Sequence, residues 1–143
     1  MDYFSVFDIS AAAMSVQKQR LDTIALNLAN SSTTRSISGG PYRRQTLVIG
    51  ERLVQPDFAA FLERERGFRL GGVQVLEVQE DDSPPRLVYE PGHPDADARG
   101  FVAYPNVDPV SEMVSMLETT RLYEASVRAL NAARTMALRA LDI

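Results

Sequence analysis

Cysteine is absent from this chain, and histidine occurs once, at His93. Without cysteine there can be no disulfide, no thiolate nucleophile and no zinc–thiolate site. One imidazole leaves a single candidate base, and the sequence contains neither a Gly-x-Ser-x-Gly nucleophile elbow nor a glycine-rich phosphate loop. We therefore expect no catalytic residue, no cofactor, no metal and no small-molecule substrate.

Charge and hydropathy exclude further classes of protein. The net charge is −4, whereas a nucleic-acid surface needs clustered lysine and arginine. No stretch approaches the roughly 20 apolar residues of a membrane span. The first residues lack a basic segment and Asp8 interrupts any apolar run, so a cleaved secretory signal is not expected. Export by a route that uses no cleaved signal stays open.

Glycine and proline are also missing from both ends of the chain. All eight glycines and all eight prolines lie between Gly39 and Pro109. These two residues break regular structure most strongly, because glycine gives the backbone wide conformational freedom and proline lacks the backbone N–H. The distribution predicts two long terminal helices around a punctuated middle.

The first helix is expected over about residues 5–30. Phe7, Met14, Leu21 and Leu28 recur at a spacing of seven, which favours a coiled-coil seam over a broad globular stripe. Alanine is more frequent than leucine between these positions. Small side chains let helices approach closely but bury little area each, so this helix depends on partners.

The second helix is expected to start at Asp108-Pro109, where an N-cap acceptor precedes a proline at the first helical position. Nothing breaks it before Ile143, which gives a rod of about 50 Å. Such a rod must pack against the first helix, against other copies, or both. The apolar residues of the two helices that we expect to make assembly contacts are Phe7, Met14, Leu21, Leu28, Met113, Leu117, Tyr123, Val127, Leu130 and Leu141.

Charges along this second helix run from acidic to basic. This order complements the helix dipole, and it would also let staggered copies pair acidic half against basic half. Both interpretations stay open. The residues concerned are Glu112, Glu118 and Glu124, followed by Arg128, Arg134 and Arg139.

The middle contains short runs typical of strands at residues 42–49, 73–78, 87–89 and 101–104. Residues 57–66 are expected to form a short helix capped by Asp57. The predicted fold is mainly α with a small β-rich middle, divided into a helix over 1–30, a loop and β-rich region over 31–105, and a helix over 106–143.

The surroundings of His93 are the one candidate for metal chemistry. Glu90, Asp95 and Asp97 lie close to it in the sequence and could supply carboxylate ligands. Prolines and a glycine in the same stretch favour a rigid turn in which His and Asp bond nearby backbone. A calcium loop is rejected, because Arg99 stands where a ligand oxygen belongs.

Three sets of residues resemble the bacterial flagellar basal-body rod proteins. The first closes the first helix, the second enters the first strand, and the third forms a turn followed by the approach to the last helix. The residues that carry the resemblance are Asn27, Leu28, Ala29, Asn30; Tyr42, Arg43, Arg44; and Glu90, Pro91, Gly92, His93, Pro94 with Pro105, Asn106 and Val107. The turn with Pro-Asn-Val is the most specific part, and it resembles the proximal rod proteins.

The resemblance implies a structural, non-enzymatic subunit of the proximal rod that assembles helically into the drive shaft and transmits motor torque. The terminal helices would pair as a coiled coil in the inner rod layer, with the middle as a short-stranded outer element. Implied partners are copies of itself, other rod proteins, the type III export apparatus and MS-ring components. The implied location is the rod where it crosses the periplasm. The alternatives are another flagellar axial subunit and, from a different class, a metal-dependent enzyme centred on His93.

Overall fold

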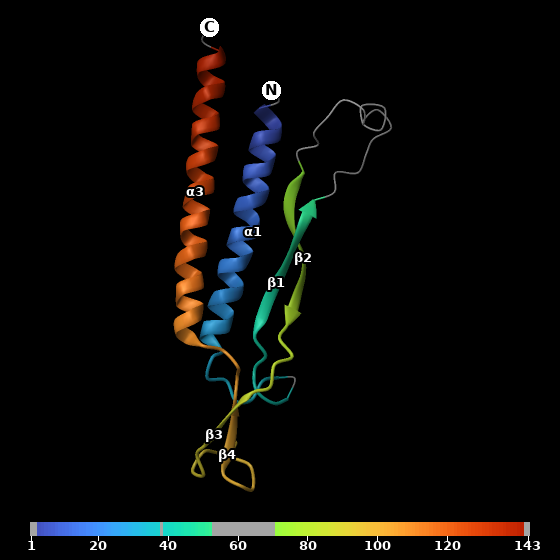
Figure 1. Ribbon diagram of the computed structural model, residues 1–143, viewed down its shortest axis with the longest axis vertical. Coiled ribbons are helices and arrows are strands. Elements are labelled where there is room, and N and C mark those ends of the chain that lie inside the picture. Colours follow the sequence, from blue (N-terminus) through green and yellow to red (C-terminus); the bar gives the residue numbers. More distant parts are fainter. Residues whose placement is uncertain (1–2, 38, 53–70, 142–143) are drawn as a thin grey trace, which may run out of the picture.

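The computed structural model describes residues 3–37, 39–52 and 71–141. Helix α1 spans Tyr3–Ala29 and helix α3 spans Pro109–Leu141. The two helices lie side by side and run in opposite directions, so that both termini are at the same end of an elongated molecule (Figure 1). Both predicted terminal helices are therefore confirmed, and the first begins two residues before the expected position.

Local hydrogen bonds explain where each helix starts or stops. The Asp108 carboxylate accepts from the backbone N–H groups of Val110 and Ser111 at 3.2 and 3.3 Å. These bonds satisfy donors that have no partner within the helix, which confirms the predicted N-cap. At the end of α1, the Asn30 side-chain amide donates to the Leu26 carbonyl at 2.9 Å. The Leu26 carbonyl also accepts the Asn30 backbone N–H at 3.0 Å, and the Leu28 carbonyl, one of the last of the helix, accepts the Ser31 hydroxyl at 2.8 Å.

The middle forms two antiparallel strand pairs. β1 (Gln45–Arg52) pairs with β2 (Gly72–Glu80), and β3 (Arg86–Tyr89) pairs with β4 (Phe101–Tyr104). All four predicted strands are present. The first begins three residues later than predicted, because the Tyr42 N–H donates to the Thr33 carbonyl at 3.1 Å and not to a strand. The predicted helix over residues 57–66 lies outside the described residues.

Helix α1 is the middle layer of the molecule. It contacts α3 on one side and the β1–β2 hairpin on the other (Figure 1). Gly72 at the start of β2 is buried against Ala12, and a Cβ atom at Gly72 would lie 3.4 Å from the Ala12 Cβ. Arg52 at the end of β1 reaches the Asp8 carboxylate at 3.5 Å. The predicted class, mainly α with a small β-rich middle, is confirmed.

The β3–β4 hairpin lies beyond the other end of the helices, at the bottom of Figure 1. Tyr89 and Phe101 pack edge to face across it, with ring centroids 5.3 Å apart. Gly100 has a φ of 83°, in the left-handed region, and a Cβ there would lie 2.9 Å from the Tyr89 ring. Glycine therefore lets the chain turn back into β4 against this aromatic pair.

The buried interior is small and partly polar. Within the described residues, the buried apolar side chains are few, and polar side chains of α1 and α3 are buried as well. Thr23 and Thr119 satisfy their hydroxyls on helix carbonyls one turn back. Within the described part, no helix combines the length and apolar character that a membrane crossing requires. The buried apolar residues are Val16, Ile24, Val102, Val107 and Ala133.

Candidate assembly interface

Asn27, near the end of α1, fixes the point where the chain enters β1. Its side chain is 1% exposed. The amide nitrogen donates to the Gln45 carbonyl at 2.9 Å, and the amide oxygen accepts from the Gln45 N–H and the Tyr42 hydroxyl, each at 2.9 Å. The side chain thus pairs with Gln45 as a neighbouring strand would. It holds the hairpin at a fixed place on α1.

Glu112 and Arg44 join α3 to the same place. The Arg44 Nε donates to Glu112 Oε1 at 2.7 Å, and the Glu112 side chain is 2% exposed. A buried carboxylate is unfavourable without a partner, so this charge-assisted bond is needed where Glu112 lies. Among the described residues, the second oxygen, Glu112 Oε2, is buried and has no hydrogen-bond partner.

The surroundings of Tyr42 disfavour ionisation of its hydroxyl. Burial, followed by the Glu112 and Glu80 carboxylates, raises the pKa of Tyr42 above its usual value of 10.0. The raised pKa disfavours the phenolate further, and the protonated hydroxyl donates to Asn27. Asn27, Tyr42, Arg44, Gln45 and Glu112 form one connected group, here called the junction, which ties α1, β1 and α3 together.

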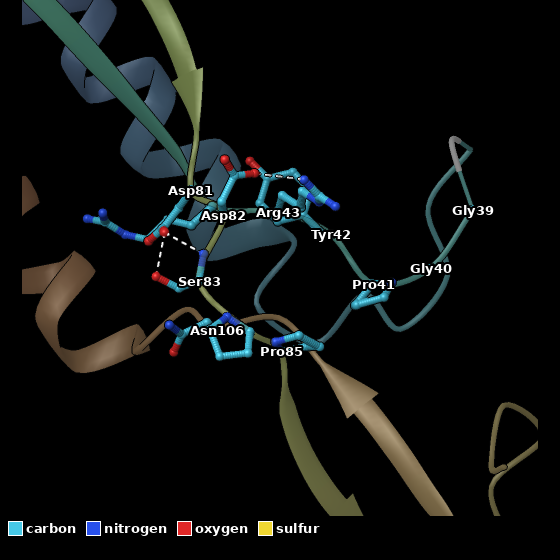
Figure 2. A pocket seen from close by; sticks show the side chains of 12 residues that line it. Gly39, Gly40, Pro41, Tyr42, Arg43, Asp81, Asp82, Ser83, Pro85 and Asn106 are labelled. Atoms are coloured by element: carbon cyan, nitrogen blue, oxygen red, sulfur yellow. Dashed lines mark hydrogen bonds and ion pairs between the residues drawn. The ribbon is translucent and has the colours of Figure 1, made fainter.

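Two of the hollows that border the junction in the described part of the chain lie close to its charged side chains. One, of about 170 Å³, lies between α1, β1 and the first turns of α3, and its lining includes Glu112, Arg20 and Ser115. The other, of about 250 Å³, lies where residues 39–44 meet residues 81–85 and Asn106 (Figure 2). Arg43 and Asp82 form an ion pair at its rim with an N–O distance of 3.0 Å (Figure 2). Neither lining has the arrangement of a nucleophile with an oriented base.

His93 is part of a turn in the β3–β4 connection. Its Nδ1 accepts from the Asp95 N–H at 3.1 Å, and its ring packs edge to face on Tyr104. The Asp95 carboxylate is occupied by the Thr34 hydroxyl at 2.8 Å and by Arg35 at 3.8 Å. Within the described ranges, no three acidic, histidine or cysteine side chains are placed to hold a metal ion. The sequence left a metal site and a rigid turn as interpretations of this stretch, and these contacts match the rigid turn.

Other parts of the predicted motifs have structural contacts of their own. Tyr104 donates to the Glu90 carboxylate at 3.0 Å. Asp97 accepts from the N–H groups of Phe101 and Arg99 at 2.9 and 2.8 Å. The hydrogen bond from the Phe101 N–H is the main cause that lowers the pKa of Asp97. The Arg99 N–H and the positive charge of the Arg99 side chain lower it further. Pro105 and Val107 are buried as the chain turns into α3, whereas Asn106 is exposed.

The predicted assembly residues are only partly used within the chain. The four heptad residues of α1 and two of the predicted residues of α3 are half-buried, whereas three others of α3 are exposed. Leu141 lies beyond the residues whose side chains are described. Among the described residues, the most deeply buried positions of the two helices are instead Val16, Thr23, Ile24 and Asn27 of α1 and Glu112, Thr119 and Ala133 of α3. The half-buried residues are Phe7, Met14, Leu21, Leu28, Val127 and Leu130, and the exposed ones are Met113, Leu117 and Tyr123.

The charge order along α3 is partly used inside the chain. Glu112 bonds to Arg44, and Glu124 lies 3.5 Å from Arg128 one turn on. Glu118 and Arg134 are exposed. Fewer charges are therefore available to pair the acidic half of one copy with the basic half of another than the sequence indicated. The order of charges also complements the helix dipole, which requires no pairing between copies.

Comparisons with known proteins agree with this layout at both ends. Residues 7–35 match the family "Flagella basal body rod protein", and residues 98–143 match "Flagellar basal body rod FlgEFG protein C-terminal". Both matches fall on the segments that contain α1 and α3. The class of protein is therefore that of the flagellar rod proteins.

Relatives that match over the full length define the family. The chain is 41% identical to the flagellar basal-body rod protein FlgC of Bacillus subtilis (strain 168), over 100% of this chain and 99% of that protein. Identity is 39% with FlgC of Escherichia coli O6:H1 (strain CFT073) and 38% with FlgC of Borreliella burgdorferi (strain B31), over 100% of this chain and 98% of each. The chain belongs to the flagellar basal-body rod protein FlgC family. It is a structural rod subunit, as the resemblance implied, and a metal-dependent enzyme is not favoured.

Sequence reasoning missed the junction. Asn27 and Arg44 were identified as motif residues, but their hydrogen bonds could not be inferred from spacing. Glu112 was interpreted only as one charge in the acidic-to-basic order along the second helix. The sequence feature that could have identified Glu112 is its position. It lies one turn after Asp108, next to Met113, which was expected to pack.

Proposed function

We propose that this subunit assembles helically with copies of itself and with other rod proteins into the proximal part of the drive shaft, and that it transmits motor torque by packing. In this proposal residues 1–30 and 106–143 pair as a coiled coil in the inner layer. Residues 31–105 form the outer element. Torque transmission requires many contacts along each helix and no catalytic pocket.

The observation that carries the proposal is the apolar surface that α3 leaves uncovered. Val110, Met113, Val114 and Leu117 are 66%, 48%, 51% and 63% exposed, at helical spacings of three and four. Apolar side chains grouped in this way on a rod-shaped subunit are typical of a protein-binding surface. Contacts with further copies or with related rod subunits would cover them.

The upper end of α3 supports the same proposal. In Figure 1 this end extends past the start of α1. Met136 and Leu138 there are 59% and 53% exposed. A helix end without a partner is only marginally stable in water, so contacts with neighbours would stabilise it.

The small buried interior is compatible with export in an unfolded state. Few apolar side chains are fully buried within the described residues, so little free energy would oppose unfolding before passage through the type III apparatus. We propose export by that route without a cleaved signal, followed by incorporation next to MS-ring components where the rod crosses the periplasm.

Deletion of Arg134–Ile143 tests the role of the last helix. We expect the shortened chain to keep the junction, since Glu112 and Asn27 lie far from the deletion, but to lose rod assembly and motility. Circular dichroism of the purified chain checks that helix content falls only by the deleted part. Motility in soft agar and recovery of the chain in purified basal bodies give the functional result. Full assembly of the shortened chain would contradict the inner-layer role of this segment.

A further inference from the structure

Two polar side chains in the connection between β3 and β4 are turned toward the rest of the chain. His93 and Asp95 are half-buried, whereas Gly92 and Pro94 beside them are exposed. The Asp95 N–H donates to the His93 Nδ1 at 3.1 Å, and the His93 ring packs edge to face on Tyr104 with ring centroids 6.2 Å apart. The backbone of Asp95 is therefore held from β4 through the imidazole ring.

The Asp95 carboxylate connects this turn to the segment that follows α1. Its Oδ2 accepts the Thr34 hydroxyl at 2.8 Å, and its Oδ1 lies 3.8 Å from Arg35 Nη1. The Arg35 side chain is 81% exposed, so this ion pair contributes little. The bond from Thr34 is partly buried and has an ionised acceptor, which makes it the stronger of the two contacts.

The segment that Asp95 contacts is a loop that closes on itself, here called the 33–42 loop. The Tyr42 N–H donates to the Thr33 carbonyl at 3.1 Å, and the Ser36 N–H donates to the Gly40 carbonyl at 2.7 Å. The first of these bonds joins the two ends of the loop. Because Tyr42 also belongs to the junction, the position of this loop determines how the chain enters the junction.

A hollow of about 350 Å³ separates part of the 33–42 loop from the β3–β4 hairpin. Its lining includes Gly40 and Pro41 on the loop side and Pro94 and Ala96 on the hairpin side. The two sides are not packed directly on each other at this place. Thr34 and Asp95 line the same hollow, and their hydrogen bond joins its two sides.

We propose that His93 is a positioning residue that orients Asp95, and that Asp95 clamps the 33–42 loop through Thr34. The imidazole acts as a hydrogen-bond acceptor in this clamp, a role that ring packing alone does not require. The clamp gives the turn around His93 a task within the subunit. It does not depend on the proposed rod contacts, so it can be tested on the free chain.

Two substitutions of His93 separate the acceptor from the ring. His93→Phe keeps a ring beside Tyr104 but has no acceptor, whereas the Oδ1 of His93→Asn can accept in the place of Nδ1. Amide hydrogen exchange of the purified full chain, followed by NMR, is measured at Ser36 and Tyr42, whose N–H groups bond within the loop. We expect protection to fall roughly fivefold in His93→Phe and to stay within about twofold of the unchanged chain in His93→Asn.

Substitutions of Thr34 test the other side of the clamp without changing the turn. Thr34→Val keeps the shape of the side chain but removes the donor to Asp95, and Thr34→Ser retains a hydroxyl. We expect loop protection to fall about tenfold in Thr34→Val and much less in Thr34→Ser. Asp95→Ala should match Thr34→Val.

Asp82→Ala is the matched control, because Asp82 is an exposed acid that pairs with Arg43 and not with the loop. Loop protection should stay unchanged in this variant. Amides of β1 that pair with β2 should keep their protection in every variant, which verifies that the fold is intact. Unchanged loop protection in Thr34→Val and Asp95→Ala would overturn the clamp. Equal losses in His93→Phe and His93→Asn would overturn the acceptor role of His93.

Discussion

At the scale of single residues, Asn27 illustrates how a polar side chain can determine the position of a strand. Its amide makes three hydrogen bonds at 2.9 Å, two of them to the backbone of Gln45. An aspartate could not donate to the Gln45 carbonyl, and a leucine could neither donate nor accept. The family motif around Asn27 therefore has a physical role in the subunit itself, apart from any contact with neighbours.

Asn27→Ala should lower the free energy of unfolding by roughly 2–3 kcal/mol, because it removes a buried amide and leaves the half-buried Gln45 backbone and Tyr42 hydroxyl without these hydrogen bonds. Urea denaturation of the purified full chain measures the change. The control is Asn131→Ala on the exposed part of α3, for which we expect a change within about 0.5 kcal/mol. Similar losses in both variants would show that the hydrogen bonds of Asn27 contribute little.

At the scale of elements, the junction makes one unit of α1, β1 and α3. The apolar contacts between the helices are supplemented by a buried polar group, Glu112, which bonds to Arg44 outside its own helix. Buried polar partners specify relative position more strictly than apolar packing does, since they must meet at fixed distances. The register of α3 against α1 and β1 therefore depends on the contact between Arg44 and Glu112.

Neighbouring arginines allow a direct comparison of a buried and an exposed ion pair. Arg44→Ala would leave the Glu112 carboxylate buried and unpaired, and we expect a loss of about 3 kcal/mol in unfolding free energy. Arg43 pairs with Asp82 while both side chains are exposed, so Arg43→Ala should cost roughly 0–1 kcal/mol. Urea denaturation of both variants at neutral pH is the measurement. Equal costs would mean that Glu112 is solvated when Arg44 is absent.

At the scale of the whole molecule, the subunit is an elongated body with little interior and much exposed apolar surface. Such a chain gains part of its stability from neighbours. Within the described residues, the α1–α3 pair, the junction and the two hairpins are held by contacts inside the chain. The upper end of α3 has the least support from the rest of the described chain (Figure 1).

Hydrogen exchange should reflect this difference. In the free chain, amides of residues 134–141 should exchange faster than those of residues 112–119, because the former have few contacts with other elements. In assembled rods, exchange at residues 134–141 should slow by about tenfold or more, whereas residues 112–119 should change less. Mass spectrometry of free and assembled protein compares the two. Equal protection of residues 134–141 in both states would contradict assembly through this helix end.

The two terminal helices, the four strand positions and the family could be predicted from the sequence. The absence of glycine and proline from the ends and the Asp108-Pro109 start act locally along the chain, so no tertiary information was needed to infer α1 and α3. The three motifs that contain Asn27, Arg44 and His93 together suggested the rod family, which the full-length relatives confirm.

Only the tertiary structure decided which face of each helix is buried and what joins the elements. The seven-residue pattern pointed to Leu21 and Leu28, yet the deepest positions of the described α1 include Thr23 and Asn27. The reason is that burial is determined by where other elements lie, and Glu112 is buried because Arg44, remote in sequence, bonds to it across the fold. Periodicity describes one helix at a time, whereas the junction and the uncovered apolar surface of α3 arise from the relative placement of three elements.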